Sequence, residues 1–194
     1  ILIIIQREFL TRIQKKSFII LTILMPFIIA AVAVARAIES VCPLDVKIKW
    51  VNDIYVNGKK LSGILTEGSF TPEGKPDFCI IGIGINVYKR EFDSEIRDIA
   101  TTVEDCCAEP PERSVLIAEV VNQLLPLLEN PRAEDILTEY RDLSILTNRE
   151  VTVKKPDGEY PATVIGIDDD YSLILSLEDG SQTKLRAGEV SIKL

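Results

Sequence analysis

Two lysines whose ammonium groups could bind an anion stand side by side in the segment KWVNDIYVNGKKLSGI, residues 49–64. Lys59 and Lys60 lie between two stretches with strand-like composition, joined by the turn-forming pair Asn57-Gly58. Successive side chains of a strand point to opposite faces, so at most one of the two lysines is a plain surface residue. A lysine on the inner face needs an anionic partner, because burying an unpaired ammonium is costly. Taken alone, the segment is also consistent with a solvated hairpin.

Further side chains that could contact a ligand flank the two lysines. Asn52 and Asp53 suit a hydroxyl, a phosphate or a Mg²⁺-bound water, and Gly63 leaves room for a ligand or another backbone. A later apolar stretch ends in Gly82-Ile83-Gly84-Ile85-Asn86, which adds two glycines and an amide. Its spacing is not G-x-G-x-x-G, so a dinucleotide site is not indicated. Each feature has a structural alternative, because these residues also form turns and bulges.

The composition excludes several classes of function. The 194 residues carry a net charge of −8, which argues against a broad nucleic-acid-binding surface but allows a local cationic site. The chain has no histidine, which removes Ser-His-Asp and Cys-His catalysis and the common histidine metal sites. We expect no metal site built from protein side chains. The four cysteines contain no C-x-x-C and indicate reduced thiols in a cytosolic protein.

Hydrophobic periodicity predicts strands, then helices, then strands again. The first group comprises VKIKWV, a hairpin through Asn57-Gly58, and DFCIIGIGINV at 77–87, which is apolar on both faces as a central strand would be. Helices are predicted at 94–107, 114–130 and 133–143. Five short strands with turn signals then follow from residue 149 and predict a small all-β barrel, with a domain boundary near 146–148.

The N-terminal region differs from the rest of the chain. The sequence begins without Met, which predicts an incomplete chain, and residues 18–35 contain no charge, so they are long enough for a membrane span. The alternative is a soluble core, in which Pro26 ends the first segment and residues 28–40 form a helix rich in small residues. We assign 28–40 to such a helix and leave both interpretations open for 1–27.

Together the motifs resemble the biotin protein ligases. The matching features are KWVNDIYVNGKKLSGILTE, the GIGINV strand and the closing GEVSIKL, in the family's order over residues 28–194. The resemblance implies an α+β fold: a core like that of class II aminoacyl-tRNA synthetases, with a mixed sheet and helices, followed by a small SH3-like β-barrel. It therefore predicts an atypical apolar segment at 1–27 (a membrane span or fusion remnant), a partial catalytic domain at 28–146 and the SH3-like domain at 147–194.

The resemblance also implies a reaction and its residues. Biotin and ATP would form biotinyl-5′-AMP, and the biotinyl group would pass to a lysine of a biotin carboxyl carrier protein, such as an acetyl-CoA carboxylase subunit. Lys60 matches the catalytic lysine that contacts biotin's carboxylate and the α-phosphate. Gly63 is assigned to biotin, and the residues assigned to ATP are Lys49, Asn52 and Asn86. Mg²⁺ is expected with ATP, nucleic acid is not expected as a partner, and the oligomeric state is left open.

One departure from the family bears on activity. The family's Gly-Arg-Gly-Arg loop, which closes over biotin and the adenylate, has no match upstream of 28–40, and this predicts impaired turnover. Two alternatives to an active cytoplasmic ligase follow. One is a catalytically inactive binding module with the ligase fold. The other is a protein anchored in a membrane through residues 18–35, with the ligase-like part in the cytosol.

Overall fold

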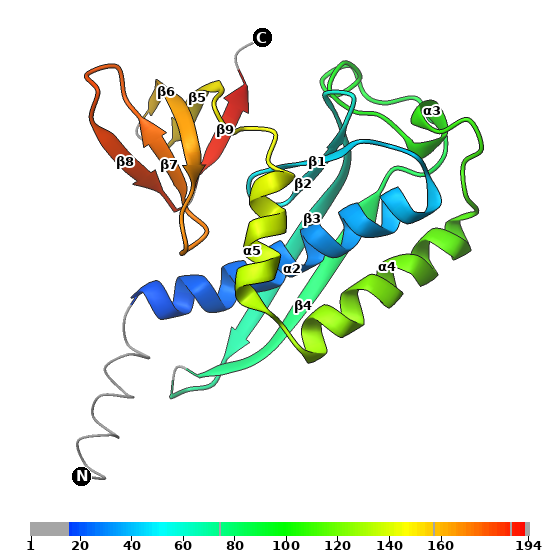
Figure 1. Ribbon diagram of the computed structural model, residues 1–194, viewed down its shortest axis with the longest axis horizontal. Helices are drawn as coiled ribbons and strands as arrows, with labels where there is room; N and C mark the ends of the chain where they lie inside the picture. The colour runs from blue at the N-terminus through cyan, green and yellow to red at the C-terminus, as the bar shows by residue number, and fades with distance from the viewer. Residues whose placement is uncertain (1–15, 74, 157, 187, 193–194) are drawn as a thin grey trace.

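A four-stranded antiparallel sheet forms the base of the larger domain (Figure 1). The computed structural model describes residues 16–73, 75–156, 158–186 and 188–192. In sheet order the strands are β1 (Val46–Lys49), β2 (Asp53–Val56), β3 (Lys59–Phe70) and β4 (Pro76–Ile85). The predicted hairpin is confirmed, since Asn57 and Gly58 join β2 to β3 with φ values of 51° and 75°.

Helix α2 (Lys16–Val41) lies across one face of this sheet and contacts all four strands (Figure 1). Its side chains from 28 to 35 are all buried, as predicted for a core helix, and they pack between the sheet and two later helices. The predicted break at Pro26 is wrong, because the helix continues through it. Burial of the following turns outweighs the lost hydrogen bond. The expectations for residues 1–15 lie outside the described residues.

Part of α2 also meets the length and composition of a membrane span. The window Leu24–Val41 has 18 residues, and more than half of it is buried inside the protein. This burial is the environment of a core helix, because α2 contacts the sheet along one side and α4 and α5 along the other. The window overlaps the span predicted at 18–35.

Strand β4 is an edge strand, so the prediction of a central strand is wrong. Among the described residues β4 pairs with β3 alone, and its Phe78 and Ile80 side chains are 56% and 55% exposed. Its apolar residues follow each other on both faces, which is typical of a buried strand. In this protein some of these apolar side chains are exposed to solvent, and so is Leu65 on the paired strand, which is 61% exposed.

Of the three predicted helices after β4, two are confirmed and one is largely wrong. Helices α4 (Arg113–Glu129) and α5 (Ala133–Asp142) pack on α2. The stretch predicted as a helix at 94–107 consists mostly of turns and ends in the short α3 (Val103–Cys106). The turns are stabilised from outside, because the backbone at residues 99–101 is hydrogen-bonded to β3.

The C-terminal domain confirms all five predicted strands. They are β5 (Glu150–Lys155), β6 (Gly158–Ile167), β7 (Leu173–Ser176), β8 (Gln182–Leu185) and β9 (Glu189–Ile192). All their pairs are antiparallel, in the order β8-β7-β6-β5-β9. Side-chain hydrogen bonds fasten this domain to the first one: the Trp50 indole N–H donates to the Tyr171 carbonyl, at 2.8 Å, and Arg141 donates to the Ile167 carbonyl and to the Asp169 carboxylate, both at 2.8 Å.

Candidate functional site

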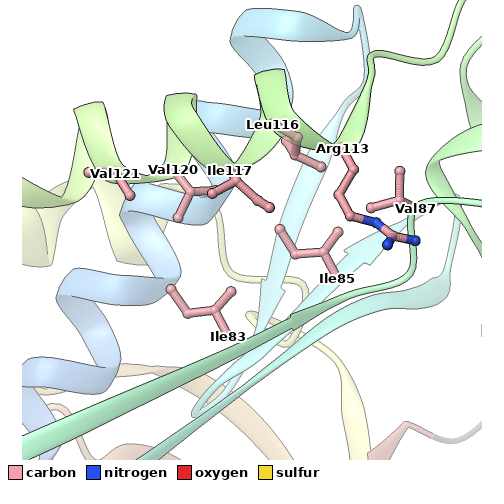
Figure 2. Close-up of a pocket in the computed structure, with 8 residues that line it drawn as sticks. All are labelled: Ile83, Ile85, Val87, Arg113, Leu116, Ile117, Val120 and Val121. Carbon is pink, nitrogen blue, oxygen red and sulfur yellow. The ribbon is translucent and has the colours of Figure 1, made fainter.

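Two of the hollows in the protein differ in the chemistry of their walls. An apolar groove of about 290 Å³ lies between β4 and α4, lined by aliphatic side chains and Arg113 (Figure 2). A polar cavity of about 500 Å³ lies between the β1–β2 segment, α2 and the C-terminal domain. The polar cavity is lined by Lys49, Asn52, Asp53 and Lys60, so it contains the residues that could bind an anion. Its volume is within the usual range for small-molecule sites.

A β-bulge turns Lys60 toward this cavity. Asp53 pairs with Gly63 and Tyr55 pairs with Lys60, so two steps along β2 are matched by three steps along β3. In a regular strand Lys60 and Gly63, three residues apart, would point to opposite faces. The extra residue, Leu61, places them on the same face. Lys59 is exposed and Lys60 is half-buried, which confirms the prediction that at most one of the two lysines is a plain surface residue.

Lys60 extends over Gly63 to reach a carboxylate. Its Nζ is 2.6 Å from Oδ1 of Asp53, and the two side chains are 40% and 22% exposed. A Cβ at position 63 would be 3.3 Å from Lys60 Cε, 3.4 Å from its Nζ and 3.6 Å from Asp53 Oδ1. Gly63 therefore makes the space through which the lysine side chain passes. The ammonium is partly exposed to the cavity and can contact a further anion there.

Lys49 supplies a second ammonium to the same cavity. Burial lowers its pKa, while the charges of Asp53 and Glu189 act in the opposite direction. Its Nζ is also 5.7 Å from the centroid of the Tyr55 ring, within the range of a cation–π contact. A partly desolvated ammonium is weakly screened and acts strongly on nearby negative charge. The cavity thus has two ammonium groups on one wall, held by acidic and aromatic neighbours.

Asn52 and Asn86 are both engaged in backbone contacts. The Asn52 amide donates to the Ile64 carbonyl, and Ile64 N–H donates back to the Asn52 carbonyl at 3.0 Å. The Asn86 amide donates to the Thr101 carbonyl at 3.1 Å, and Thr101 N–H donates to the Lys60 carbonyl at 2.9 Å. Asn52 lines the cavity, whereas Asn86 holds the loop that fixes the backbone of Lys60.

The structure therefore brings Lys49, Asn52 and Lys60 to one cavity, places Gly63 beneath Lys60 and sets Asn86 behind it. The assignment of Lys60 and Gly63 to biotin, and of Lys49, Asn52 and Asn86 to ATP, stays a prediction. Two charged residues of the cavity were missed, Arg186 and Glu189 of the C-terminal domain. No local pattern marks them, because they approach the first domain only through the fold.

The segment that carries these residues is held on both sides. The Trp50 side chain is buried, with 5% of its surface exposed, and the Trp50–Val51 peptide bond is cis. The Tyr140 hydroxyl, on α5, donates to the Val51 carbonyl at 2.8 Å. The C-terminal domain accepts from Trp50 through Tyr171. The backbone just before Asn52 is thus fixed by both a helix and the second domain.

Comparison with known proteins gives two family matches. Residues 9–86 match the model of the "Biotin/lipoate A/B protein ligase family", and residues 147–193 match the "Biotin protein ligase C terminal domain". The first match includes every site residue predicted from the sequence, and it begins ahead of residue 28, where the resemblance noted from the sequence starts. The second coincides with the five-stranded domain.

Individual relatives agree with these matches. The chain is 36% identical to the bifunctional ligase/repressor BirA of Bacillus subtilis over 165 residues, 79% of this chain and 48% of that protein. It is 29% identical to the biotin--[acetyl-CoA-carboxylase] ligase of Mycobacterium tuberculosis over 159 residues, 78% of this chain and 54% of that protein. The chain thus spans about half the length of these relatives.

A solved structure agrees at the level of the fold. The biotin protein ligase of Aquifex aeolicus, in complex with biotin and ATP, superposes with a TM-score of 0.73 at 24% identity, covering 88% of this chain and 71% of that one. The fold therefore agrees with the two family matches on both domains. The chain belongs to the biotin protein ligase family.

Proposed function

We propose that this protein activates biotin with ATP and transfers it to a protein lysine. In the first step a biotin carboxylate oxygen bonds to the α-phosphorus of ATP. The bond from that phosphorus to the bridging oxygen breaks, and pyrophosphate leaves with the electron pair. The product is biotinyl-5′-AMP. In the second step a lysine amine attacks the biotinyl carbonyl, the amide forms, AMP leaves, and the amine loses a proton.

The observation that carries this proposal is the Lys60 ammonium, which passes over Gly63 and is held by Asp53 at 2.6 Å in the polar cavity. An ammonium at this place would contact the biotin carboxylate and the α-phosphate, which repel each other before they react. It would stabilise the charge that builds up on the phosphoryl oxygens in the transition state. Asp53 keeps the flexible side chain in place, which lowers the entropy cost of positioning it.

Lys49 and Asn52 are proposed to act on the nucleotide. The Lys49 ammonium is partly desolvated and would interact with a phosphate more strongly than a solvated lysine would. The Asn52 amide is bonded to the Ile64 carbonyl, so its side-chain oxygen is the group that could accept from the nucleotide. Asn86 would act through the loop that it fastens to the Lys60 backbone.

Mg²⁺ is proposed to enter with ATP. Among the described residues no group of three His, Cys, Asp or Glu side chains could hold a metal ion. Mg²⁺ bound to a nucleotide needs only one or two carboxylates besides the phosphates, and Asp53 and Glu189 line the cavity. The residues therefore fit a nucleotide-borne ion, which would neutralise part of the phosphate charge when bound.

The acceptor is proposed to be a biotin carboxyl carrier protein, and one relative is named as a ligase that attaches biotin to acetyl-CoA carboxylase. We also propose a cytoplasmic location. The alternative is anchoring in a membrane through the apolar N-terminal part of α2. Fractionation of the expressed chain decides between them, because a soluble protein is recovered without detergent and an anchored one requires it.

The test of the function is biotin-dependent release of pyrophosphate from ATP, compared between Lys60→Ala and Lys59→Ala. Lys59 is exposed and adjacent in sequence, so it is a matched control. We expect Lys60→Ala to reduce the rate of pyrophosphate release at least about 100-fold, the loss typical of a group that stabilises transition-state charge. It should also weaken the binding of biotin and ATP. Lys59→Ala should have little effect. Equal effects would refute the role of Lys60, and ATP binding without turnover in the unsubstituted chain would support the inactive binding module.

A further inference from the structure

The C-terminal domain contributes a guanidinium to the cavity that holds Lys60. Arg186 follows β8 directly and lines the polar cavity, together with Gly188 and Glu189. Its side chain is 53% exposed. Lys49 and Lys60 line the same cavity from the first domain. The cavity therefore has cations on two sides, in a chain whose net charge is −8.

The contact that Arg186 makes inside the protein is weak. Its Nε and one terminal nitrogen both donate to a single oxygen, Oδ2 of Asp170, at 3.3 Å. The other carboxylate oxygen of Asp170 is occupied by the N–H and hydroxyl of Ser172. Strong guanidinium–carboxylate pairs are shorter and use two oxygens in parallel. Asp170 thus orients Arg186 through one carboxylate oxygen and does not form a bidentate pair with it.

A structural arginine in the same protein shows the contrast. Arg36 donates to both oxygens of Glu139, at 2.7 Å and 2.5 Å, and this pair joins α2 to α5. The guanidinium of Arg186 has no such closed pairing with Asp170, and its planar group matches the geometry of a phosphate. The two lysines of the cavity have closer neighbours, since Lys60 is 2.6 Å from Asp53 and Lys49 lies against the Tyr55 ring.

We propose that Arg186 binds the pyrophosphate part of ATP, that is, the group that leaves in the first step. This proposal rests on the proposed function. It adds one residue, Arg186, and assigns Lys60 and Arg186 to different phosphate groups of ATP. Lys60 would act at the α-phosphorus, where the bond to biotin forms. Arg186 would accept the negative charge that moves onto pyrophosphate as the bond to the α-phosphorus breaks. The second step contains no pyrophosphate, so Arg186 would serve the first step alone.

The first experiment measures binding of inorganic pyrophosphate by calorimetry, with the full chain and its Arg186→Ala and Asp170→Asn variants. We expect Arg186→Ala to weaken binding at least about tenfold, the effect of losing a charge-assisted contact. Asp170→Asn frees the guanidinium and should leave binding unchanged or tighter. Unchanged binding in Arg186→Ala, an equal loss in both variants, or no binding to the full chain would each overturn the proposal.

The second experiment separates the two steps. Transfer from purified biotinyl-5′-AMP to a carrier protein is measured in a single turnover, and formation of the adenylate from ATP is measured separately. Arg186→Ala should slow adenylate formation and leave transfer unchanged. An equal slowing of both steps would mean that Arg186 maintains the structure of the site and would overturn the proposal. Lys184→Ala, which removes a cation paired with Asp168, is the control for a general change in charge.

The two proposals fail in different ways. If the full chain releases no biotin-dependent pyrophosphate and Lys60→Ala changes nothing, the proposed function fails, yet calorimetry with pyrophosphate still decides the role of Arg186. If Lys60→Ala abolishes release while Arg186→Ala binds pyrophosphate normally, the function stands and the role of Arg186 fails. Circular dichroism of each variant confirms that the chain is folded.

Discussion

Substituting Gly63 by alanine should separate stability from activity. A Cβ at this position would lie 3.3 Å from Lys60 Cε and 3.4 Å from its Nζ, closer than ordinary van der Waals contact. The obstructing atoms are the end of a flexible side chain, so the chain can relieve the contact by moving the ammonium a few tenths of an ångström. Replacing glycine by alanine within a strand otherwise stabilises a protein, by about 0.5–1 kcal/mol. We therefore expect Gly63→Ala to leave the free energy of unfolding unchanged or to raise it.

The same substitution should lower the rate of biotin-dependent pyrophosphate release. A displacement of about 1 Å can lower a rate about 100-fold, so a few tenths of an ångström at Lys60 should cost roughly two- to tenfold. Urea denaturation measures the first effect, and biotin-dependent pyrophosphate release measures the second. Gly68→Ala, whose Cβ would meet only the Phe78 carbonyl at 3.9 Å, is the control on the same strand. A variant destabilised by more than about 1 kcal/mol, with unchanged activity, would refute the role of Gly63 as space for Lys60.

Three further predictions concern buried groups. Tyr140→Phe removes the hydroxyl donor to the Val51 carbonyl and should lower the free energy of unfolding by about 0.5–1.5 kcal/mol, measured in urea; no change would contradict this. Burial raises the pKa of the Cys42 thiol to about 12, so at pH 8 a thiol reagent should modify the exposed Cys79 before Cys42, which should react only on unfolding; mass spectrometry of the labelled peptides reports the order. Burial lowers the pKa of Lys49 from 10.5, so between the lowered value and 10.5 the unfolded chain binds more protons and stability should rise with pH. The Lys49→Met variant should lose this rise, and an identical pH dependence in both proteins would exclude it.

Local patterns predicted the parts of the fold that depend on local chemistry. The Asn57-Gly58 turn and the five C-terminal strands follow from turn residues and alternation, and both are confirmed. Strand β4 was predicted as central because its residues are apolar on both faces, yet sheet position depends on which other strands are present. The turns at 94–99 have helical spacing, but hydrogen bonds from the Lys60 backbone stabilise an irregular path. At Pro26 the sequence predicts a break but the structure has a continuous helix, because the packing of α2 outweighs the effect of the proline.

The candidate site was predictable to a similar extent. The sequence motif contains Lys60, Asp53 and Gly63, but the bulge at Leu61 that places them on one face is not apparent from residue spacing. With regular alternation Lys60 and Gly63 would be expected on opposite faces. Arg186 could not be predicted, because it lies 126 positions after Lys60 and meets the cavity only through the packing of two domains.

The same packing makes the site a property of both domains. Trp50 donates to Tyr171 in the second domain, and Val51 accepts from Tyr140, so the two residues immediately before Asn52 are fixed from two directions. Any shift of the C-terminal domain would move the Trp50 end of this segment and, with it, the Asp53 carboxylate that holds Lys60. The same shift would also move Arg186, which lines the cavity from the C-terminal domain. Under the proposed roles, the positioning of Lys60 and the binding of pyrophosphate by Arg186 would be coupled through one interface, and a change at that interface should affect the first step more than the second.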